Sequence, residues 1–539
     1  MEGRMMHFPL TLVHLLERAG QYYPEVRIAS RLPDRSVRHT TYGDFYRRSL
    51  KFANALRRLG VQKGDRVATL AWNHYRHLEA YFAVPVMGAV YHTLNPRLHP
   101  SDLAYIMNHA DDRVLLVDDV LLPVFERFRA EVHPRHVIVW SHGQPVPEGF
   151  IDYEALIEPE PETFDYPDID EDQAAGMCYT SGTTGRPKGV VYSHRGIVLH
   201  SLVSAMANTL SISQYDAVMP VVPMFHVNAW GLPFTSVLAG ARQVFPGPHL
   251  DPDSLLDLVQ SEKVTITAGV PTVWLGVLER LDREPGKYDT RSLRAIVVGG
   301  SAAPQAMIEA YEKRHGLNVV HAWGMTEMTP LGTICTLKPH LLDRPQEERY
   351  RYRAMQGRPV PFVEVRAVGD SGPVPWDGRT MGELQVRGPW IASSYFENPG
   401  EADKFTPDGW FRTGDIVTID PEGYVRITDR AKDLIKSGGE WISSVDLENA
   451  IMGHPAVKEA AVVAVPHPKW GERPLAVVVL REGAQATADE LRAFLEPRFA
   501  KWWLPDAFVF TDQIPRTAAG KFLKSALREQ YREYRWENA

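Results

Sequence analysis

The chain has 539 residues, of which 44% are hydrophobic, 23% are charged and 10% are aromatic, and its formal net charge is −8 at pH 7. This length is too great for one compact hydrophobic core, so at least two domains are expected, and the ordinary composition excludes a disordered, collagen-like or disulfide-scaffold protein. Because 67 acidic residues outnumber 59 basic ones, no overall positive field is available to bind nucleic acid or an anionic membrane surface.

The cysteine content and the apolar stretches bear on the compartment. Two cysteines, Cys178 and Cys335, are too few for a disulfide framework, so we expect a reducing, cytoplasmic location. The first twenty residues lack the basic start, apolar run and cleavage site of a secretory signal. The best candidate for a membrane span, Ala80 to Val90, is short and interrupted by Pro85, so we expect a core element and no integral membrane segment.

Helix and strand patterns alternate through the first four hundred residues. Thr41 can cap a helix that ends at Gly60, and Ser101 can open another. Alternation of this kind predicts sheets with helices on both faces, whose ligands usually bind beyond the carboxyl ends of the strands. The strands predicted from short apolar runs are 67–70, 114–117, 174–178 and 295–298.

The pattern changes after about Val363. The runs FVEVRAV, GELQVRG and GYVRITD are separated by Gly, Pro and Asp turns and predict a smaller β-rich subdomain. A new α/β series follows residue 430, with helix 444–452, strands 460–465 and 475–480, and a helix opened by a capping box at Thr487 and Glu490. We therefore predict an α/β protein with one domain over 1–430 and a small α+β domain over 431–539.

The segment from Tyr179 to Val190 has the composition of a phosphate-binding loop. Three glycines let the backbone approach an anion, four hydroxyl side chains can donate to it, and Lys188 adds a positive charge. The Walker pattern needs Gly-Lys-Ser/Thr, whereas here Lys188 follows Pro187 and precedes Gly189. The loop therefore predicts a polyphosphate ligand outside the P-loop class. Its candidate ligand residues are Thr180, Ser181, Gly182, Thr183, Thr184, Gly185 and Lys188.

This loop and four later motifs resemble, in order, those of the adenylate-forming superfamily of acyl-CoA synthetases, peptide-synthetase adenylation domains and luciferases. Many members have glycine where this chain has Asp429. The resemblance covers essentially the whole chain and implies the acyl-CoA synthetase/luciferase-like fold, with a mobile C-terminal domain. The four later motifs are Trp323-Gly324-Met325-Thr326-Glu327, Trp410-Phe411-Arg412-Thr413-Gly414-Asp415, Asp429-Arg430-Ala431-Lys432-Asp433 and Pro515 to Lys521.

The resemblance implies a two-step reaction with ATP and coenzyme A as co-substrates. A carboxylate attacks the α-phosphate of ATP to give an acyl-adenylate and pyrophosphate, and the thiol of coenzyme A then displaces AMP. Since the first step brings two anions together, charge neutralisation should dominate catalysis. The resemblance assigns Mg²⁺ to Thr180 and Glu327, the essential ammonium to Lys521, and the hinge between two poses of the C-terminal domain to Lys432.

The same resemblance gives the remaining nucleotide contacts. Asp415 should accept the ribose hydroxyls, with Arg430 nearby, and Trp323 should stack on adenine. Gly438, Gly439 and Trp441 should approach the site in the second step. The further residues that the resemblance assigns to ATP are Val227, Gly300, His321, Ala322, Gly324, Thr326, Lys432, Lys436 and Trp441.

The segment Pro223 to Gly231 matches the part of the family that lines the acyl pocket. Amino-acid-activating relatives carry an aspartate where His226 stands here, and this segment has no acid, so a substrate ammonium would lack a partner. Trp230 and Val227 are assigned to an apolar acyl channel, although Trp230 could equally be a core residue, and His226 is placed among the catalytic residues.

The sequence therefore predicts an AMP-forming fatty acid:CoA ligase, with a preference for long chains and with a homodimer suggested by family analogy. Two alternatives stay open. The acid could instead be a medium-chain, methylthio-alkanoate or aryl acid, or the protein could be a non-catalytic acyl-AMP or nucleotide-binding protein. Cys178 is expected to be a small buried core residue, because the attacking thiol belongs to coenzyme A.

Overall fold

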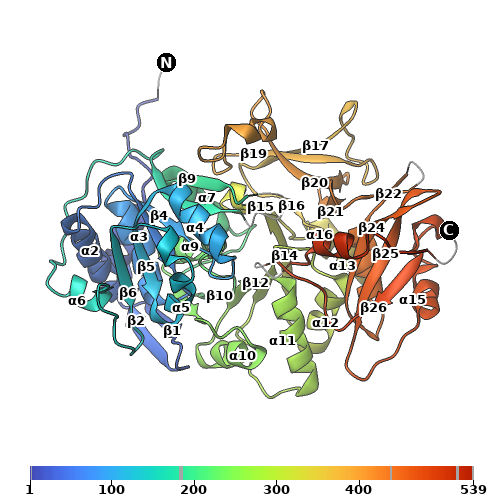
Figure 1. Ribbon diagram of the computed structural model, residues 1–539, viewed down its shortest axis with the longest axis horizontal. Coiled ribbons are helices and arrows are strands. Elements are labelled where there is room, and N and C mark those ends of the chain that lie inside the picture. Colours follow the sequence, from blue (N-terminus) through green and yellow to red (C-terminus); the bar gives the residue numbers. More distant parts are fainter. Residues whose placement is uncertain (2, 181–185, 438–439, 518–520, 537–539) are drawn as a thin grey trace.

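The computed structural model describes residues 1, 3–180, 186–437, 440–517 and 521–536, without the side chains of Glu440 and Trp441. A first sheet lies in the N-terminal part of the chain (Figure 1), in the order β7-β6-β5-β3-β4-β8-β9, and is parallel apart from the β8–β9 pair. Its strands are β3 (Arg66–Leu70), β4 (Val90–Thr93), β5 (Asp112–Asp118), β6 (His136–Trp140), β7 (Ile151–Asp152), β8 (Ala174–Tyr179) and β9 (Gly189–Ser193).

A second sheet has the order β16-β15-β14-β13-β12-β10-β11-β1-β2 and is parallel from β14 to β1, with antiparallel strands at both edges. Its strands are β1 (Arg27–Arg31), β2 (Val37–Thr41), β10 (Ala217–Pro220), β11 (Arg242–Phe245), β12 (Ile266–Gly269), β13 (Ala295–Val298), β14 (Val319–Gly324), β15 (Leu331–Ile334) and β16 (Arg358–Pro359).

Helices fill the space between these sheets and cover their outer faces. The central helices share one buried apolar cluster with both sheets, and this cluster is the main core of the protein. The central helices are α1 (Leu12–Tyr22), α2 (Tyr42–Arg58), α3 (Tyr75–Val86), α7 (His194–Ala205) and α9 (Leu232–Ala239); α4 (Pro100–Ala110) and α5 (Leu122–Glu126) cover the first sheet, and α10 (Pro252–Ser261), α11 (Pro271–Arg283) and α12 (Gln305–His315) cover the second. Two short helices, α6 (Tyr153–Ile157) and α13 (Gln346–Arg353), complete this part.

The rest of the chain forms an antiparallel sheet and a separate C-terminal α+β unit, shown in orange and red in Figure 1. The third sheet consists of β17 (Glu364–Gly369), β18 (Gly372–Pro373), β19 (Gly382–Arg387), β20 (Phe411–Ile419) and β21 (Val425–Arg430). The C-terminal unit contains β22 (Ile435–Ser437), β23 (Glu440–Ile442), β24 (Val457–His467), β25 (Gly471–Leu480) and β26 (Ala507–Phe510), with α14 (Ser444–Met452), α15 (Ala488–Leu495) and α16 (Lys524–Gln530).

The α/β architecture predicted from the alternating pattern is confirmed. Helix α2 is capped by Thr41 through a capping box, and Thr487 and Glu490 form the predicted box on α15. Cys178 is buried, as expected. One prediction was wrong in detail: α4 begins at Pro100 with His99 as its cap, and not at Ser101, because proline fits the first helical position. Strand β20 was not among the predicted strands.

The domain boundary near residue 430 stays a prediction. Strand β21 of the third sheet ends at Arg430, and β22 of the C-terminal unit begins at Ile435. Across the described ranges, no helix combines the length and the apolar character that a bilayer crossing requires.

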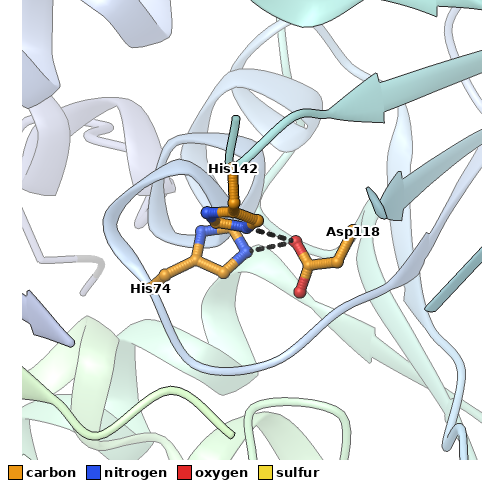
Figure 2. A group of neighbouring side chains, drawn as sticks. All are labelled: His74, Asp118 and His142. Carbon is orange, nitrogen blue, oxygen red and sulfur yellow. Dashed lines mark hydrogen bonds and ion pairs between the residues drawn. The ribbon is translucent and has the colours of Figure 1, made fainter. Parts of the chain in front are cut away.

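A buried cluster of His74, Asp118 and His142 joins the loop after β3, the end of β5 and the loop after β6 in the first sheet (Figure 2). Nε2 of His74 lies 2.8 Å, and Nε2 of His142 3.3 Å, from the same oxygen of Asp118. The second oxygen of Asp118 accepts the backbone N–H of Trp72 at 2.8 Å. Two imidazoles and a carboxylate are also the donor set of many zinc and iron sites, so the protonation of the rings decides what the cluster can bind.

The hydrogen bonds of the two Nδ1 atoms show which nitrogen of each imidazole carries the proton. Nδ1 of His74 accepts the backbone N–H of His77 at 3.2 Å, and Nδ1 of His142 accepts from the guanidinium of Arg76 at 3.0 Å. Both of those groups can only donate, so each Nδ1 is unprotonated and each Nε2 carries the proton that it donates to Asp118. The Nε2 lone pairs that a metal would need are therefore absent, and the cluster is a hydrogen-bonded joint.

The loop that contains His74 also contacts the second sheet. Asn73, between Trp72 and His74, donates from its amide to the carbonyls of Pro220 and Val222 and accepts the N–H of Met224. The loop after β3 of the first sheet thereby holds the segment that leaves β10 of the second.

Asp118→Asn should destabilise the fold, because one amide oxygen cannot replace two carboxylate oxygens that serve three N–H donors. We expect a loss of about 2–4 kcal/mol in the free energy of unfolding, measured by urea denaturation. Asp111→Asn is the matched control, since its exposed ion pairs with Arg66 and Arg113 should contribute less than about 1 kcal/mol. A melting temperature of the wild type that falls after dialysis against a chelator would contradict the proton-filled cluster.

Candidate active site

A cavity of about 740 Å³ is lined by residues from the second sheet, the third sheet and the C-terminal unit. The second sheet contributes the carboxyl ends of β12, β13 and β14, where an open α/β sheet usually binds its ligand. Of the predicted site residues, the cavity wall contains Thr180, Lys188, His226, Val227, Trp230, Gly300, His321, Ala322, Trp323, Gly324, Thr326, Glu327, Asp415, Arg430, Lys432 and Lys521.

A few predicted residues are not placed in this wall. Lys436 lies on β22, with its backbone N–H bonded to Glu472, and does not line the cavity. The predictions for Ser181, Gly182, Thr183, Thr184, Gly185, Gly438 and Gly439, and for the side chain of Trp441, lie outside the described residues.

The two ends of the phosphate loop are hydrogen-bonded to each other where β8 ends and β9 begins. The backbone N–H of Thr180 donates to the carbonyl of Lys188 at 2.9 Å, and the backbone N–H of Lys188 donates to the Thr180 hydroxyl oxygen at 3.1 Å. The ammonium of Lys188 is 2.6 Å from Glu401 and 5.3 Å from the centre of the Tyr395 ring. The loop therefore begins and ends in the cavity wall with one cation already oriented.

Two buried carboxylates face the cavity, each held by aromatic hydrogen-bond donors. Tyr395 donates to Oε1 of Glu327 at 2.6 Å. The indole N–H of Trp323 donates to Oδ2 of Asp415 at 3.0 Å, and the guanidinium of Arg430 lies 2.6 Å from Oδ1. In the described part of the chain, Oε2 of Glu327 accepts no hydrogen bond, so one oxygen of this carboxylate is available to a ligand.

Lys521 is the catalytic-lysine candidate, and it lies close to Gly300. A Cβ placed on Gly300 would lie 3.8 Å from Cε of Lys521. Removal from solvent, together with the positive charge of Arg430, lowers the pKa of Lys521 to about 8, although Asp415 and Glu327 attract its proton. A segment of the C-terminal unit thus brings an ammonium group among the carboxylates of the N-terminal part.

The predicted acyl-pocket segment has an unusual backbone. Val227, Asn228, Ala229 and Trp230 all have positive φ, between 39° and 56°, so α8 (Val227–Trp230) is a left-handed turn. Each such residue costs roughly 1–2 kcal/mol. The buried Asn228 stabilises the turn, because its amide donates to Tyr91 at 2.7 Å and its carbonyl accepts from the thiol of Cys178 at 3.2 Å.

This left-handed turn directs Trp230 into the cavity wall. A Cβ on Gly299 would lie 3.1 Å from the Trp230 ring, so the indole packs directly on the glycine turn after β13. Of the two alternatives for Trp230, the structure supports a pocket-lining residue. Burial, with the positive charges of Lys521 and Arg97 nearby, lowers the pKa of His226 to about 4, so its imidazole is neutral near pH 7.

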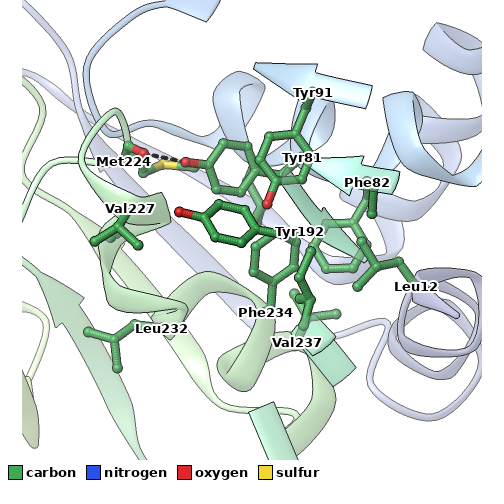
Figure 3. Packing of buried hydrophobic residues seen from close by; sticks show 14 of the residues in the cluster. Leu12, Tyr81, Phe82, Tyr91, Tyr192, Met224, Val227, Leu232, Phe234 and Val237 are labelled. Carbon is green, nitrogen blue, oxygen red and sulfur yellow. Dashed lines mark hydrogen bonds between the residues drawn. The ribbon is translucent and has the colours of Figure 1, made fainter. Parts of the chain in front are cut away.

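Buried tyrosines lie beside the acyl segment (Figure 3), and one of them also holds the Trp323–Glu327 motif. Tyr81 stacks on both Tyr91 and Phe234, with ring centroids 4.9 and 5.3 Å away, and the Tyr91 and Phe234 centroids are themselves 5.9 Å apart. Its hydroxyl donates to the carbonyl of Met224, and the hydroxyl of Tyr192 donates to the carbonyl of Thr326 at 2.8 Å.

Sequence patterns did not point to the residues that orient the predicted site residues. Tyr395 and Glu401 lie in SSYFENPGE, a segment without a recognisable motif, and contact Glu327 and Lys188 from the loop after β19. No spacing or composition signal relates them to the phosphate loop, since they lie more than 200 residues away in the chain.

Comparison with known proteins follows the same division of the chain. The AMP-binding enzyme family matches residues 16–396, and the AMP-binding enzyme C-terminal domain matches residues 446–521. The chain is 53% identical to the long-chain-fatty-acid–CoA ligase of Thermus thermophilus, with 99% of both chains covered. It is 45% identical to the 3-methylmercaptopropionyl-CoA ligase of Ruegeria lacuscaerulensis, again over 99% of both.

A solved structure shares the arrangement of the whole chain. The crystal structure of the anthranilate CoA ligase AuaEII in complex with anthranoyl-AMP matches with a TM-score of 0.87 and 25% identity, covering 98% of this chain and 99% of that one.

Proposed function

The chain belongs to the AMP-binding enzyme family and is an AMP-forming acyl-CoA ligase that uses ATP and coenzyme A, and we propose that its acid is a long-chain fatty acid. The observation that carries the proposal is that one cavity is lined both by the ionic groups and by a series of apolar side chains. The apolar lining includes Leu210, Leu232, Ala268, Leu275 and Val297. Such a lining suits an alkyl chain attached to a carboxylate.

In the first half-reaction, a carboxylate oxygen attacks the α-phosphorus of ATP, and the bond from that phosphorus to pyrophosphate breaks. We assign the ammonium of Lys521 to the carboxylate and α-phosphate oxygens, where negative charge accumulates in the transition state. Arg430 adds positive charge nearby, since it lies within 2.6 Å of Asp415 and lowers the pKa of Lys521. The neutral imidazole of His226 borders the same space without repelling Lys521.

We assign Asp415 to the ribose hydroxyls and Trp323, with His321, Ala322 and Gly300, to the adenine site. The buried carboxylate of Asp415 is held by Trp323 and Arg430 in one orientation, which favours recognition of paired hydroxyls. Both ring nitrogens of His321 are used, Nδ1 toward the carbonyl of Ala354 at 3.0 Å and Nε2 toward the N–H of Ala303 at 3.4 Å, so His321 shapes the wall and does not exchange protons.

The hydroxyl of Thr180 and the open oxygen of Glu327 fit a Mg²⁺ ion, because both are hard oxygen donors in the cavity wall. Mg²⁺ bound there would neutralise charge on the triphosphate. Tyr395 restricts the Glu327 carboxylate to one orientation through its 2.6 Å hydrogen bond, so this chain supplies an oriented ligand.

In the second half-reaction, the sulfur of coenzyme A attacks the acyl carbonyl carbon, the bond to AMP breaks, and the thiol proton passes to solvent. We propose that the C-terminal unit turns about Lys432 between the two steps. Lys432 lies between β21 of the third sheet and β22 of the C-terminal unit, where a few residues can absorb a large dihedral change. A homodimer, from the family resemblance, and a cytoplasmic location, from the low cysteine content, are further proposals.

The acid can be identified by measuring pyrophosphate release with a panel of acids, from C2 to C18 together with aryl and methylthio acids, with and without coenzyme A. We expect the largest kcat/KM with long-chain fatty acids. Activity restricted to aryl, short or methylthio acids would contradict the fatty-acid assignment and favour a function like that of the Ruegeria relative. Absence of release with every acid would instead indicate a protein that only binds nucleotides.

Lys521→Ala should reduce adenylate formation by about 10²–10³-fold, measured as ATP–pyrophosphate exchange. Because the pKa of Lys521 is lowered to about 8, its ammonium is present below that pH and is lost as the pH rises through it. For the wild type, kcat/KM for ATP should therefore fall above pH 8. Lys521→Arg keeps its charge, so a parallel fall in that variant would show that another group titrates.

Lys432→Pro should slow the thioester step by about tenfold or more, because the proline ring fixes φ where the hinge must rotate. Adenylate formation, which uses the pose described here, should change little. The two half-reactions are measured separately, by ATP–pyrophosphate exchange and by thioester formation from synthetic acyl-adenylate. Lys432→Ala separates loss of the side chain from loss of rotation, and an equal effect of Pro on both steps would exclude the hinge role.

A further inference from the structure

Asp429 connects the two sides of the proposed hinge. It lies on β21, and its buried Oδ2 accepts both the backbone N–H of Ser444 at 2.8 Å and the hydroxyl of Ser444 at 2.6 Å. Ser444 is the first residue of α14 in the C-terminal unit. A carboxylate from the third sheet thus binds the N-terminal end of a helix that lies beyond Lys432, where anions are stabilised by the free N–H groups and the helix dipole.

The contact continues from Ser444 to the segment that carries Lys521. Lys524 donates to the Ser444 hydroxyl oxygen at 2.6 Å and lies 2.7 Å from Oε1 of Glu448, both within a nearly buried cluster. Lys524 opens α16, three residues after Lys521. Through Ser444 and Lys524, Asp429 is linked by two successive hydrogen-bonded contacts to the element that follows the catalytic-lysine candidate.

The buried charges of this network need the partners that the present pose provides. Asp429, Glu448 and Lys524 are removed from solvent together, so each carboxylate needs the ammonium or the helix N–H groups as partners. Burial raises the pKa of Glu448 to about 7, even though the positive charge of Lys524 stabilises the carboxylate and acts to lower that pKa. A rotation about Lys432 that moves α14 away from β21 would break the contact between Asp429 and Ser444.

We propose that Asp429 is a positioning residue for adenylate formation, holding the C-terminal unit in the pose that places Lys521 in the nucleotide cavity. The inference rests on the proposed two-step function with its hinge at Lys432. It assigns a role to the carboxylate of Asp429, which precedes the hinge and binds the first residue of α14. A contact present in one pose and absent from the other shifts the population of poses.

Asp429→Gly tests the proposal. ATP–pyrophosphate exchange should fall by about tenfold, since two hydrogen bonds to a carboxylate are lost. Thioester formation from synthetic acyl-adenylate and coenzyme A should stay within about twofold of wild type or become faster, because the adenylation pose no longer competes. The acid is whichever gives the fastest exchange with the wild type, so failure of the fatty-acid assignment leaves this test intact.

Arg426→Ala is the matched control. Arg426 also lies on β21 and also contacts α14, through an ion pair of 2.6 Å with Asp446, but its side chain is about half exposed. An exposed pair contributes little, so both half-reactions should stay within about twofold of wild type. Ser444→Ala removes the hydroxyl shared by Asp429 and Lys524 and should reproduce part of the loss in exchange.

Asp429→Asn guards against a folding defect in the glycine variant. It keeps the volume and one acceptor oxygen, so its melting temperature should fall less than that of Asp429→Gly, and exchange should also fall less. If Asp429→Gly unfolds, the Asn and Ser444→Ala variants decide the question alone. Equal losses in both half-reactions, or exchange within twofold of wild type in a folded variant, would overturn the proposal.

Discussion

The site depends on the placement of a positive charge where a positive charge is costly. Lys521 enters a cavity whose wall contains Arg430 and Lys432 as well as the carboxylates of Glu327 and Asp415, and removal from solvent lowers its pKa. A lysine tuned in this way contributes little to stability but is ready to bind an anion, because the negative charge of a triphosphate and a carboxylate would compensate for the lost solvent. The ammonium of Lys521 is therefore fully stabilised only when the substrates are bound.

The N-terminal part provides a rigid frame for that charge. The carboxylates are held by neighbouring donors, Glu327 by Tyr395 and Asp415 by Trp323 and Arg430, so they are oriented in the absence of ligand. The left-handed turn that presents Trp230 would be unfavourable alone, but Asn228 satisfies it with hydrogen bonds to the buried aromatic core. Strain at a binding segment is thus maintained by the surrounding packing.

The C-terminal unit is attached by contacts of a different kind. It contacts β21 through a small polar network of Asp429, Ser444, Lys524 and Glu448. Hydrogen bonds and ion pairs can exchange for water when the surfaces separate, whereas an extensive apolar interface would resist separation. A polar joint of this type is compatible with the proposed change of pose.

The sequence alone determined the layered α/β architecture, because period and capping signals are local: the capping boxes at Thr41 and Thr487 fixed the starts of α2 and α15. The motif resemblance identified residues of the cavity wall, from Thr180 to Lys521, because short sequence motifs contain them. Only the tertiary structure decided what orients them, and which distant groups neutralise one another. Tyr395 beside Glu327, Asp118 between two histidines, and Asp429 at the first residue of α14 are contacts between different elements, 15 to 68 residues apart in the chain. Burial and long-range hydrogen bonding select such partners, and neither leaves a periodic mark in the sequence.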